Sequence, residues 1–356
     1  TQNLGFGITV NLSYESPYQF ARRFASLDHL TQGRIGWNIV TGYLDSAERL
    51  IGQKGLKDHD LRYEQAEEFL QLCYKFWEGS WENDAVLKDK KQRIFTDPSK
   101  VHQVQHQGLF YQSQGVFQVS PSIQRTPVLF QAGASPRGLT FATQHAEGLF
   151  IGGDRPEKIK QQVDQIRNKA TAQGRNPEAI KIFVGITVVT AETDELAQQK
   201  LDEYIRYASP EAGLAHFSSS VGMDLSQFAD DETIPYQKTN SIASVNNKFK
   251  EQSISKNDLK AQHVLGGRYP LIVGSGATVA EKLIQLIDDT GIDGFNLTRT
   301  VAPESHHDFI QWVIPELQQR GRYKTEYENG SLRHKLFQQG DRLSASHPVQ
   351  QFRCQS

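Results

Sequence analysis

Residues 59–63, HDLRY, place an imidazole, a carboxylate, a guanidinium and a phenol at the entrance of an expected amphipathic helix. His59 and Tyr63 are four positions apart, so they share one face of the helix once it has begun. Donors and cations grouped in this way can hold a bound anion. The ordinary alternative is a solvated helix start, and the local pattern taken alone favours that alternative for His59. Arg62 can add charge to such a site or pair with a neighbouring carboxylate on the surface.

The turn QAGASPRG, residues 131–138, is a second candidate anion site. Gly133 lets the backbone turn tightly, and Ser135 stands where the next helix is expected to begin. A serine at that position can cap the helix or donate its hydroxyl to an anion at the helix N-terminus. A plain strand-to-helix turn with a serine cap is the alternative, and the residues by themselves favour it.

Three polar side chains lie in apolar runs that are typical of strands. LGFGITV is short, apolar and contains glycine, as expected of a buried parallel strand. Thr9 is near its end, where the hydroxyl can bond a ligand at the carboxyl end of the strand. An ordinary β-branched strand residue is the alternative for Thr9. Asn38 and Thr41 belong to GWNIVT, and a buried amide must be hydrogen-bonded to a ligand or to a neighbouring strand. Both are therefore interpreted as residues that line a pocket.

Other chemical signals are weaker. His102 and His106 have the i, i+4 spacing of a metal pair on a helix, but no carboxylate or cysteine joins them, so a structural or surface role is expected. GSGATVAEK, residues 274–282, lacks the lysine–serine pair of a phosphate loop and is interpreted as a turn into a capped helix. No Ser-His-Asp order for acyl transfer stands out. We expect no metal site.

These candidate residues are distributed over short apolar strands that alternate with amphipathic helices. A helix is expected between the cap Ser16 and the stop Gly33, and another over residues 60–77. The expected strands are LGFGITV, RIGWNIVTG, TPVLFQAG, GLFIGG, KIFVGITVVTA and DGFNLTR. Such alternation predicts right-handed βαβ units and a parallel sheet. Six strands suit either an open doubly wound sheet or a (β/α)8 barrel without two of its strands.

Two stretches, at about 78–126 and 209–270, break this alternation and are expected to be irregular insertions. The first is polar and rich in glutamine, and its segment GLFYQSQGVFQV, residues 108–119, predicts a small hairpin. A C-terminal tail is expected over 322–356.

Composition excludes several classes of protein. The 356 residues are 22% charged with a formal net charge of −2, and no basic stripe interleaved with aromatics predicts a nucleic-acid partner. No apolar run reaches the roughly 20 residues that a membrane span needs. The two cysteines, Cys73 and Cys354, do not have CxxC spacing, and Cys73 is expected in a core, which fits a reducing, soluble compartment. Because the chain begins TQNLGFGITV without a methionine, we expect that its beginning was lost or processed away.

The sequence resembles a known family at a set of segments that come in the family's order and spacing. The segments are LDHLTQGRIGWNIVT, HDLRYEQAEEFL, DPSKVHQVQHQGLFYQSQG, VLFQAGASPRG, VGMDLSQF, WVIPELQQRGRYKTEY and LRHKLF. They are similar to flavin-dependent monooxygenases of the nitrilotriacetate, pristinamycin and dibenzothiophene-sulfone type, a branch of the bacterial-luciferase-like barrels. The resemblance implies an α/β fold, a single (β/α)8 barrel domain over 1–356 that here starts at its third strand. It places a flavin-contacting aspartate in an upstream segment.

The resemblance also implies the cofactor and its contacts. Reduced FMN, supplied by a separate NAD(P)H:FMN reductase, reacts with O2, and a flavin C4a-peroxide inserts one oxygen atom into a small organic substrate. The positions that match flavin contacts of the family are Thr9, His59, Tyr63 and Ser135, followed by the pocket-lining Asn38, Thr41 and Ala134. No single catalytic side chain is implied, since the cofactor performs the difficult chemistry. The two insertions are expected to roof the pocket and set substrate choice.

Other expectations follow from the family. Its members act on chelating amino acids, sulfones and depsipeptide precursors, so a role in xenobiotic degradation is expected, in a cytoplasmic dimer or tetramer without nucleic-acid or membrane partners. A non-catalytic or degenerate flavin-binding barrel is one alternative. A metal-dependent barrel hydrolase that uses His59 and Asp60 is another.

Overall fold

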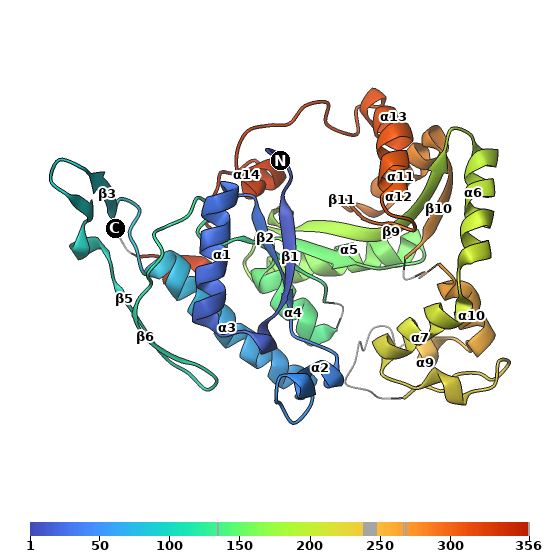
Figure 1. The fold of residues 1–356 in the computed structure, drawn as a ribbon, viewed down its shortest axis with the longest axis horizontal. Helices are drawn as coiled ribbons and strands as arrows, with labels where there is room; N and C mark the ends of the chain where they lie inside the picture. The colour runs from blue at the N-terminus through green and yellow to red at the C-terminus, as the bar shows by residue number, and fades with distance from the viewer. Residues whose placement is uncertain (134, 238–247, 266, 268, 355–356) are drawn as a thin grey trace. The chain divides into compact units, whose positions relative to one another are not determined.

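The structure is a computed structural model, which describes residues 1–133, 135–237, 248–265, 267 and 269–354 (Figure 1). The chain divides into two compact units. The first consists of Thr1–Leu149, Arg167–Ile180 and Glu328–Ser356, and the second of Phe150–Ile166 and Lys181–Tyr327. Each unit combines parallel strands with helices, which confirms the predicted α/β class. A single barrel domain over 1–356 stays a prediction.

Four neighbouring parallel strands form the sheet of the first unit. They are β1 (Phe6–Asn11), β2 (Ile35–Val40), β7 (Val128–Gln131) and β8 (Gly148–Ile151), in that order. Of β8, the residues Gly148 and Leu149, which pair with β7, belong to this unit. Thr9 is opposite Asn38, and Ile39 is opposite Gln131. Because the strands are parallel, Asn11, Val40 and Gln131 end at the same edge of the sheet. The expected strands in this part of the chain are thereby confirmed.

Two helices cover one face of this sheet. They are α1 (Pro17–Thr31) and α3 (His59–Gly79), both close to the expected bounds. The Ser16 side chain accepts a hydrogen bond from the Gln19 N–H and so caps α1. Between the helices, the fully buried Trp37 ring lies 4.3 Å from the centroid of Phe20 and 6.0 Å from that of Phe69. This aromatic core fixes β2 against α1 and α3.

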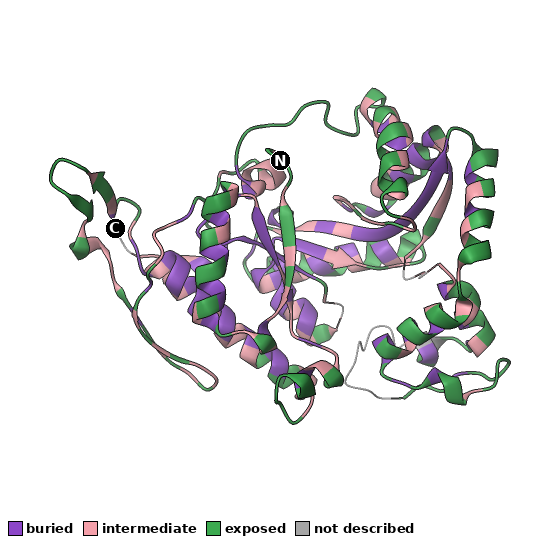
Figure 2. Ribbon diagram, viewed as in Figure 1, coloured by how far each residue is buried: buried purple, intermediate pink, exposed green. Residues whose placement is uncertain are grey.

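The strand β1 differs from the expectation of a buried strand. It carries exposed and half-buried residues, whereas β2 is mostly buried (Figure 2). Among the described residues β1 pairs only with β2, so its apolar sequence is covered on one side alone. An apolar, glycine-containing run does not by itself distinguish an edge strand from a central one.

The stretch 78–126 contains two hairpins. The antiparallel pairs are β3 (Val86–Asp89) with β4 (Ile94–Thr96) and β5 (Gln103–Gln107) with β6 (Gln112–Val116). The predicted hairpin is confirmed, although it begins before residue 108. The Glu68 carboxylate on α3 accepts hydrogen bonds from the backbone N–H groups of Phe110 and Tyr111 at 2.9 and 2.7 Å, which anchors the β5–β6 turn.

The C-terminal tail is bound to the first unit through Arg333, which lies in α14 (Leu332–Phe337) and is 2% exposed. Its guanidinium donates to both carboxylate oxygens of Glu147, at 2.6 and 2.9 Å. Glu147 in turn accepts the Leu129 N–H of β7 at 3.1 Å. Arg333 also donates to the carbonyls of Thr126 and Pro127, so the tail holds the entry to β7.

In the second unit, β9 (Lys181–Ala191) pairs in parallel with both β10 (Leu271–Ser275) and β11 (Gly294–Thr298). The strand β10 was not expected, because its apolar run is short and leads into a glycine turn. The associated helices are α6 (Asp194–Tyr207), α11 (Gly276–Thr290), α12 (Glu304–Asp308) and α13 (Ile314–Gln319), with a π-helical segment, η5 (Phe309–Val313). Between β8 and β9 the chain forms the helix α5 (Pro156–Ala172).

The prediction that 209–270 is irregular is wrong for the part of it that the structure describes. The stretch holds α7 (Pro210–Val221), a 3-10 turn η4 (Leu225–Gln227), α9 (Lys248–Glu251) and α10 (Lys256–His263). Buried Leu214, Phe217 and Leu259 contribute to a separate apolar core. The helices α7 and α10 begin at the serine caps Ser209 and Ser255, and such serines are hard to distinguish from loop residues in the sequence. None of the helices described is long and apolar enough to cross a membrane.

The Arg333–Glu147 pair provides a test of how the tail contributes to stability. Replacing Arg333 with Met leaves the buried Glu147 carboxylate without its cation, which should lower the free energy of unfolding by about 3–5 kcal/mol. Urea-induced unfolding followed by circular dichroism measures this loss. Arg320→Met is the matched control, since the Arg320–Glu316 pair is more exposed and its N–O distance is 3.4 Å. The control should change stability by about 1 kcal/mol or less. Equal effects of the two substitutions would refute the role assigned to Arg333.

Candidate functional site

Polar side chains of β1 and β2 meet across the strand pair. The Asn38 amide nitrogen donates to the Thr9 hydroxyl at 3.0 Å. The amide oxygen of Asn38 is buried and has no hydrogen-bond partner among the residues that the structure describes. The Thr9 hydroxyl on the neighbouring strand thus accepts a hydrogen bond from the amide nitrogen of Asn38, and the amide oxygen is left as a free acceptor.

The phenol of Tyr63 connects three separate segments of the first unit. Tyr63 lies in α3 and is 6% exposed, and the polar side chains of Thr41, Gln131 and Ser135 are near its hydroxyl. These residues follow β2, end β7 and precede the next helix. Burial raises the pKa of Tyr63 above its usual value, and the three polar side chains oppose that rise. The phenol therefore keeps its proton at neutral pH.

The first residue of HDLRY meets the QAGASPRG turn. The His59 Nε2 atom lies 3.2 Å from the Ser135 hydroxyl oxygen, and its Nδ1 atom lies 2.8 Å from the Asp60 carboxylate. Ser135 is the N-cap of α4 (Pro136–His145) and accepts the Gly138 N–H at 3.0 Å. The imidazole ring is 5.2 Å from the ring of Tyr63. His59, Tyr63 and Ser135 thus gather at the N-terminus of α4.

Arg62 does not extend to the surface. It is 3% exposed and donates to the Lys57 carbonyl at 2.9 Å, so a surface pair with a neighbouring carboxylate is wrong. Arg62 lies on the face of α3 that packs inward, and burial lowers the pKa of its guanidinium. A different cation approaches the site, because the Arg137 guanidinium lies 5.8 Å from the centre of the Tyr63 ring.

The predicted residues therefore fall into two groups within the first unit. Thr9 and Asn38 form one pair, and Thr41, His59, Tyr63 and Ser135 form a connected cluster, while Ala134 lies outside the described residues. Sequence reasoning missed Gln131, which ends β7 and is 2% exposed. A polar residue at the end of the apolar run VLFQ was the available signal.

Glycine at position 138 is required for the cluster to close. A Cβ atom added to Gly138 would lie 2.6 Å from the Tyr63 hydroxyl oxygen and 2.9 Å from that of Ser135. Both distances are too short for a carbon atom, so any larger residue would displace one of the two hydroxyls.

The histidines considered for a metal have other partners. His106 is part of the extended strand β5, so the helical spacing does not apply; its Nε2 atom lies 3.1 Å from Glu68. The Nε2 atom of His102 lies 2.8 Å from Glu82. Within the described ranges no three His, Cys, Asp or Glu side chains are grouped to hold a metal. GSGATVAEK is the expected turn into a capped helix, with Ser275 as the N-cap of α11.

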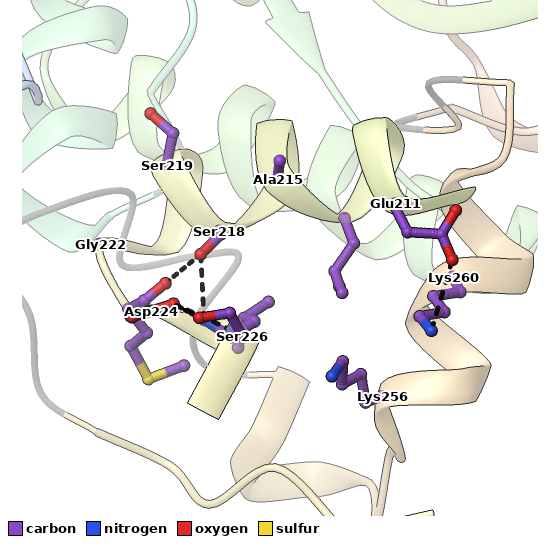
Figure 3. A pocket seen from close by; sticks show the side chains of 12 residues that line it. Glu211, Ala215, Ser218, Ser219, Gly222, Asp224, Ser226, Lys256 and Lys260 are labelled. Carbon is purple, nitrogen blue, oxygen red and sulfur yellow. Dashed lines mark hydrogen bonds and ion pairs between the residues drawn. The ribbon is translucent and has the colours of Figure 1, made fainter. Parts of the chain in front are cut away.

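A pocket of about 530 Å³ lies in the helical insertion of the second unit, between α7, η4 and α10 (Figure 3). Its charged side chains pair with one another: the Lys260 amine is 3.6 Å from Glu211 and 3.0 Å from Asp230. The Ser218 hydroxyl is bonded to the backbone of Met223 and Leu225. Polar and charged groups of this pocket are thus largely occupied by hydrogen bonds and ion pairs within the protein.

Comparison with known proteins identifies the family. The pattern of the luciferase-like monooxygenases matches residues 1–294. The chain belongs to this family, and the predicted monooxygenase class is confirmed.

The similarity extends along nearly the whole chain. Dimethyl-sulfide monooxygenase of Hyphomicrobium sulfonivorans is 44% identical over 99% of this chain and 75% of its own length, and its crystal structure superposes with a TM-score of 0.91. Long-chain alkane monooxygenase of Geobacillus thermodenitrificans is 44% identical over 99% of this chain and 77% of its own length. Riboflavin lyase, solved with modified FMN and riboflavin, has a TM-score of 0.94 at 39% identity, covering 100% of this chain and 79% of that one.

The branch named from the sequence is also confirmed. Dibenzothiophene-sulfone monooxygenase, the nitrilotriacetate monooxygenase component and pristinamycin IIA synthase are 36, 32 and 30% identical to this chain. The fold is therefore that of the luciferase-like barrels, with a parallel sheet. FMN and O2, the expected cofactor and co-substrate, are those of this group of enzymes, one of which is named an FMNH2-dependent monooxygenase. A flavin reductase is the kind of partner that such component enzymes need.

Gly138→Ala tests the close contact at the N-terminus of α4. Alanine within a helix is ordinarily more favourable than glycine by up to about 1 kcal/mol. Here we expect the opposite sign, a loss of about 1–3 kcal/mol of unfolding free energy, because the new methyl group overlaps Tyr63 and Ser135. Thermal unfolding measures the change.

The double variant Gly138→Ala with Tyr63→Phe is the control for this prediction. Removing the phenol oxygen relieves the 2.6 Å contact but leaves the 2.9 Å contact with Ser135. Alanine at position 138 should therefore cost less stability in the Tyr63→Phe background than in the unmodified protein, so the two substitutions should not be additive. Additive losses would place the strain elsewhere in α4.

Proposed function

We propose that the chain is the oxygenating component of a two-component monooxygenase that binds FMNH2 through the cluster beyond the ends of β2 and β7. The observation that carries the proposal is the convergence of Thr41, His59, Tyr63 and Ser135, from distant parts of the sequence, on the N-terminus of α4. Backbone N–H groups and hydroxyls at a helix N-terminus are suited to a phosphate group.

The donor and acceptor set fits a flavin nucleotide. Ser135, Tyr63 and His59 would hold the phosphate, with Arg137 adding charge nearby. The buried, unpartnered amide oxygen of Asn38 needs a hydrogen-bond donor, and an N–H of the isoalloxazine ring is one. Thr9 orients that amide by accepting a hydrogen bond from its nitrogen, so both groups would act on the polar edge of the ring.

The protein's own contribution is binding and exclusion of water. Reduced FMN supplies the electrons that activate O2, so no acid–base pair is required of the chain. The insertions over 78–126 and 209–270 would take part in selecting the small organic substrate. Homo-oligomerisation to a dimer or tetramer and a cytoplasmic location stay predictions.

A second candidate function is a reaction in which a flavin is the substrate. The similarity to riboflavin lyase, over the whole of this chain, favours it. The two candidates are separated by incubating the full-length protein with a flavin reductase, NADH, FMN and riboflavin in air. Loss of riboflavin, followed by chromatography, would support the lyase reaction. Retention of riboflavin with oxygenation of a sulfide, alkane or sulfone would support the monooxygenase.

Anaerobic titration with FMNH2 tests the assignment of the cluster. Tyr63→Phe removes one donor to the phosphate and should weaken binding by about 1 kcal/mol, or roughly fivefold. Quenching of protein fluorescence gives the dissociation constant.

Tyr111→Phe is the matched control, because the Tyr111 hydroxyl bonds Gln65 near the β5–β6 hairpin and is not part of the cluster. Its affinity for FMNH2 should equal that of the unmodified protein. If Tyr63→Phe also leaves the affinity unchanged, the cluster does not hold the cofactor.

A further inference from the structure

His347, in the C-terminal tail, is held by both of its ring nitrogens. It directly precedes the 3-10 helix η6 (Pro348–Phe352) and is 2% exposed. Its Nε2 atom lies 2.9 Å from the carbonyl oxygen of His145, and its Nδ1 atom accepts the N–H of Val349 at 3.1 Å. A carbonyl oxygen only accepts, so Nε2 carries the proton, and Nδ1 must be unprotonated in order to accept. The ring is therefore fixed as one neutral tautomer.

The surroundings of this ring disfavour a second proton. Burial lowers the pKa of His347 well below its ordinary value, and the positive charge of Arg175 lowers it further. The hydrogen bond to the His145 carbonyl opposes this fall, whereas the His145 ring and the guanidinium of Arg333 add to it. From α3, the ring of Tyr74 faces His347 with the ring centres 5.8 Å apart. The docked tail thus keeps His347 neutral.

A second proton would also remove the cap of η6. An imidazolium ring has a proton on each nitrogen and accepts no hydrogen bond. The Val349 N–H would then face another N–H, and because Val349 is fully buried, its donor would be left without a partner. A buried donor without a partner is costly, so the docked tail and a charged His347 are incompatible.

The remaining contacts of the segment do not titrate near neutral pH. The ring of Phe352 lies 5.6 Å from that of Tyr74, and the Arg353 guanidinium lies 3.3 Å from the Glu78 carboxylate. Burial would raise the pKa of Glu78, but Arg342 and the other partners of this carboxylate outweigh burial and hold its pKa below the ordinary value. Glu78 therefore stays ionised in mild acid, and its ion pair with the tail persists.

We propose that residues His347–Cys354 form a clasp on α3 and α4 that mild acid releases through protonation of His347. In the released clasp the ring meets water and takes up a proton below about pH 6.5. Because only the released form binds this proton, each further fall of one pH unit lowers the equilibrium constant for docking about tenfold. Above that pH, docking does not depend on His347 titration. The inference goes beyond the proposed function and does not depend on it.

Hydrogen exchange of the whole protein measures docking of the clasp. Mass spectrometry follows the peptide that contains Val349, from about pH 7.5 to about pH 5, with rates corrected for the intrinsic pH dependence of exchange. The protection of this peptide should be level above about pH 6.5 and fall about tenfold per pH unit below it. The helix α1, which is capped by Ser16, is the internal reference and should keep its protection.

His347→Asn is the decisive variant. The asparagine side-chain oxygen can still cap η6, and the amide does not titrate, so protection of the clasp should become independent of pH. His334→Asn is the matched control, because it makes the same substitution at a tail histidine that lies in α14 and outside the clasp. It should keep the steep pH dependence. Both variants retain His145, whose ring nitrogens lie 2.8 Å from Glu67 and 3.3 Å from the Tyr74 hydroxyl.

Several outcomes would overturn the clasp. One is a level profile in the unmodified protein, and another is an equal pH dependence in His347→Asn. A parallel loss of protection in α1 is a third, since the first unit as a whole would then be unfolding. If the asparagine variant does not dock its tail at neutral pH, nitrogen NMR of the histidine rings decides. The His347 signal, identified by its absence from the variant, must then show a neutral ring with its proton on Nε2, and a charged ring or the other tautomer would refute the inference.

Discussion

The placement of the buried Tyr63 phenol is the constraint on which the candidate site depends. The side chain is almost completely buried, and polar side chains from three separate segments oppose the rise in its pKa that burial causes. Thr41 follows the end of β2, Gln131 ends β7 and Ser135 begins α4. The parallel register of the strands brings these ends to one edge, and α3 carries the phenol to them. A shift of any one segment would separate these polar groups, so the geometry of the site depends on the packing of α3 against the sheet.

Much of the first unit could be predicted because its local signals agree with the final fold. The helix α1 begins at the serine cap and stops at Gln32 and Gly33, both of which have positive φ, as the sequence indicates. Burial depends on neighbours in space and is not encoded locally. This is why β1 was expected to be buried, and why the three apolar residues of β10 before Gly274 were not recognised as a strand.

The candidate site shows the same limit. The spacing of His59 and Tyr63 places them on one face of a helix, and a serine begins α4, but these local signals alone favoured a solvated helix start and a plain serine cap. The resemblance to the family was needed to single out these three residues. Gln131 has no such pattern, since a single glutamine at the end of a strand is also common on the surface. A role in the site and a surface pair were both open for Arg62 in the sequence, whereas its position in α3 turns it inward. Only the packing of α3 against the sheet decides between these positions.

Buried polar groups of the first unit are paired in some places and unpaired in others. Arg333 engages Glu147, and Asp28 accepts two hydrogen bonds from Gln124 at 3.0 and 2.7 Å. Among the buried side-chain oxygens that have no hydrogen-bond partner within the described residues are those of the Asn38 and Gln131 amides and one of the Glu48 carboxylate. Asn38 and Gln131 belong to β2 and β7, which are neighbours in one sheet. An unpaired acceptor in a sheet is costly for stability, so a donor supplied by a ligand would remove that cost. Under the proposed function, a ring N–H of the flavin nucleotide is such a donor for Asn38.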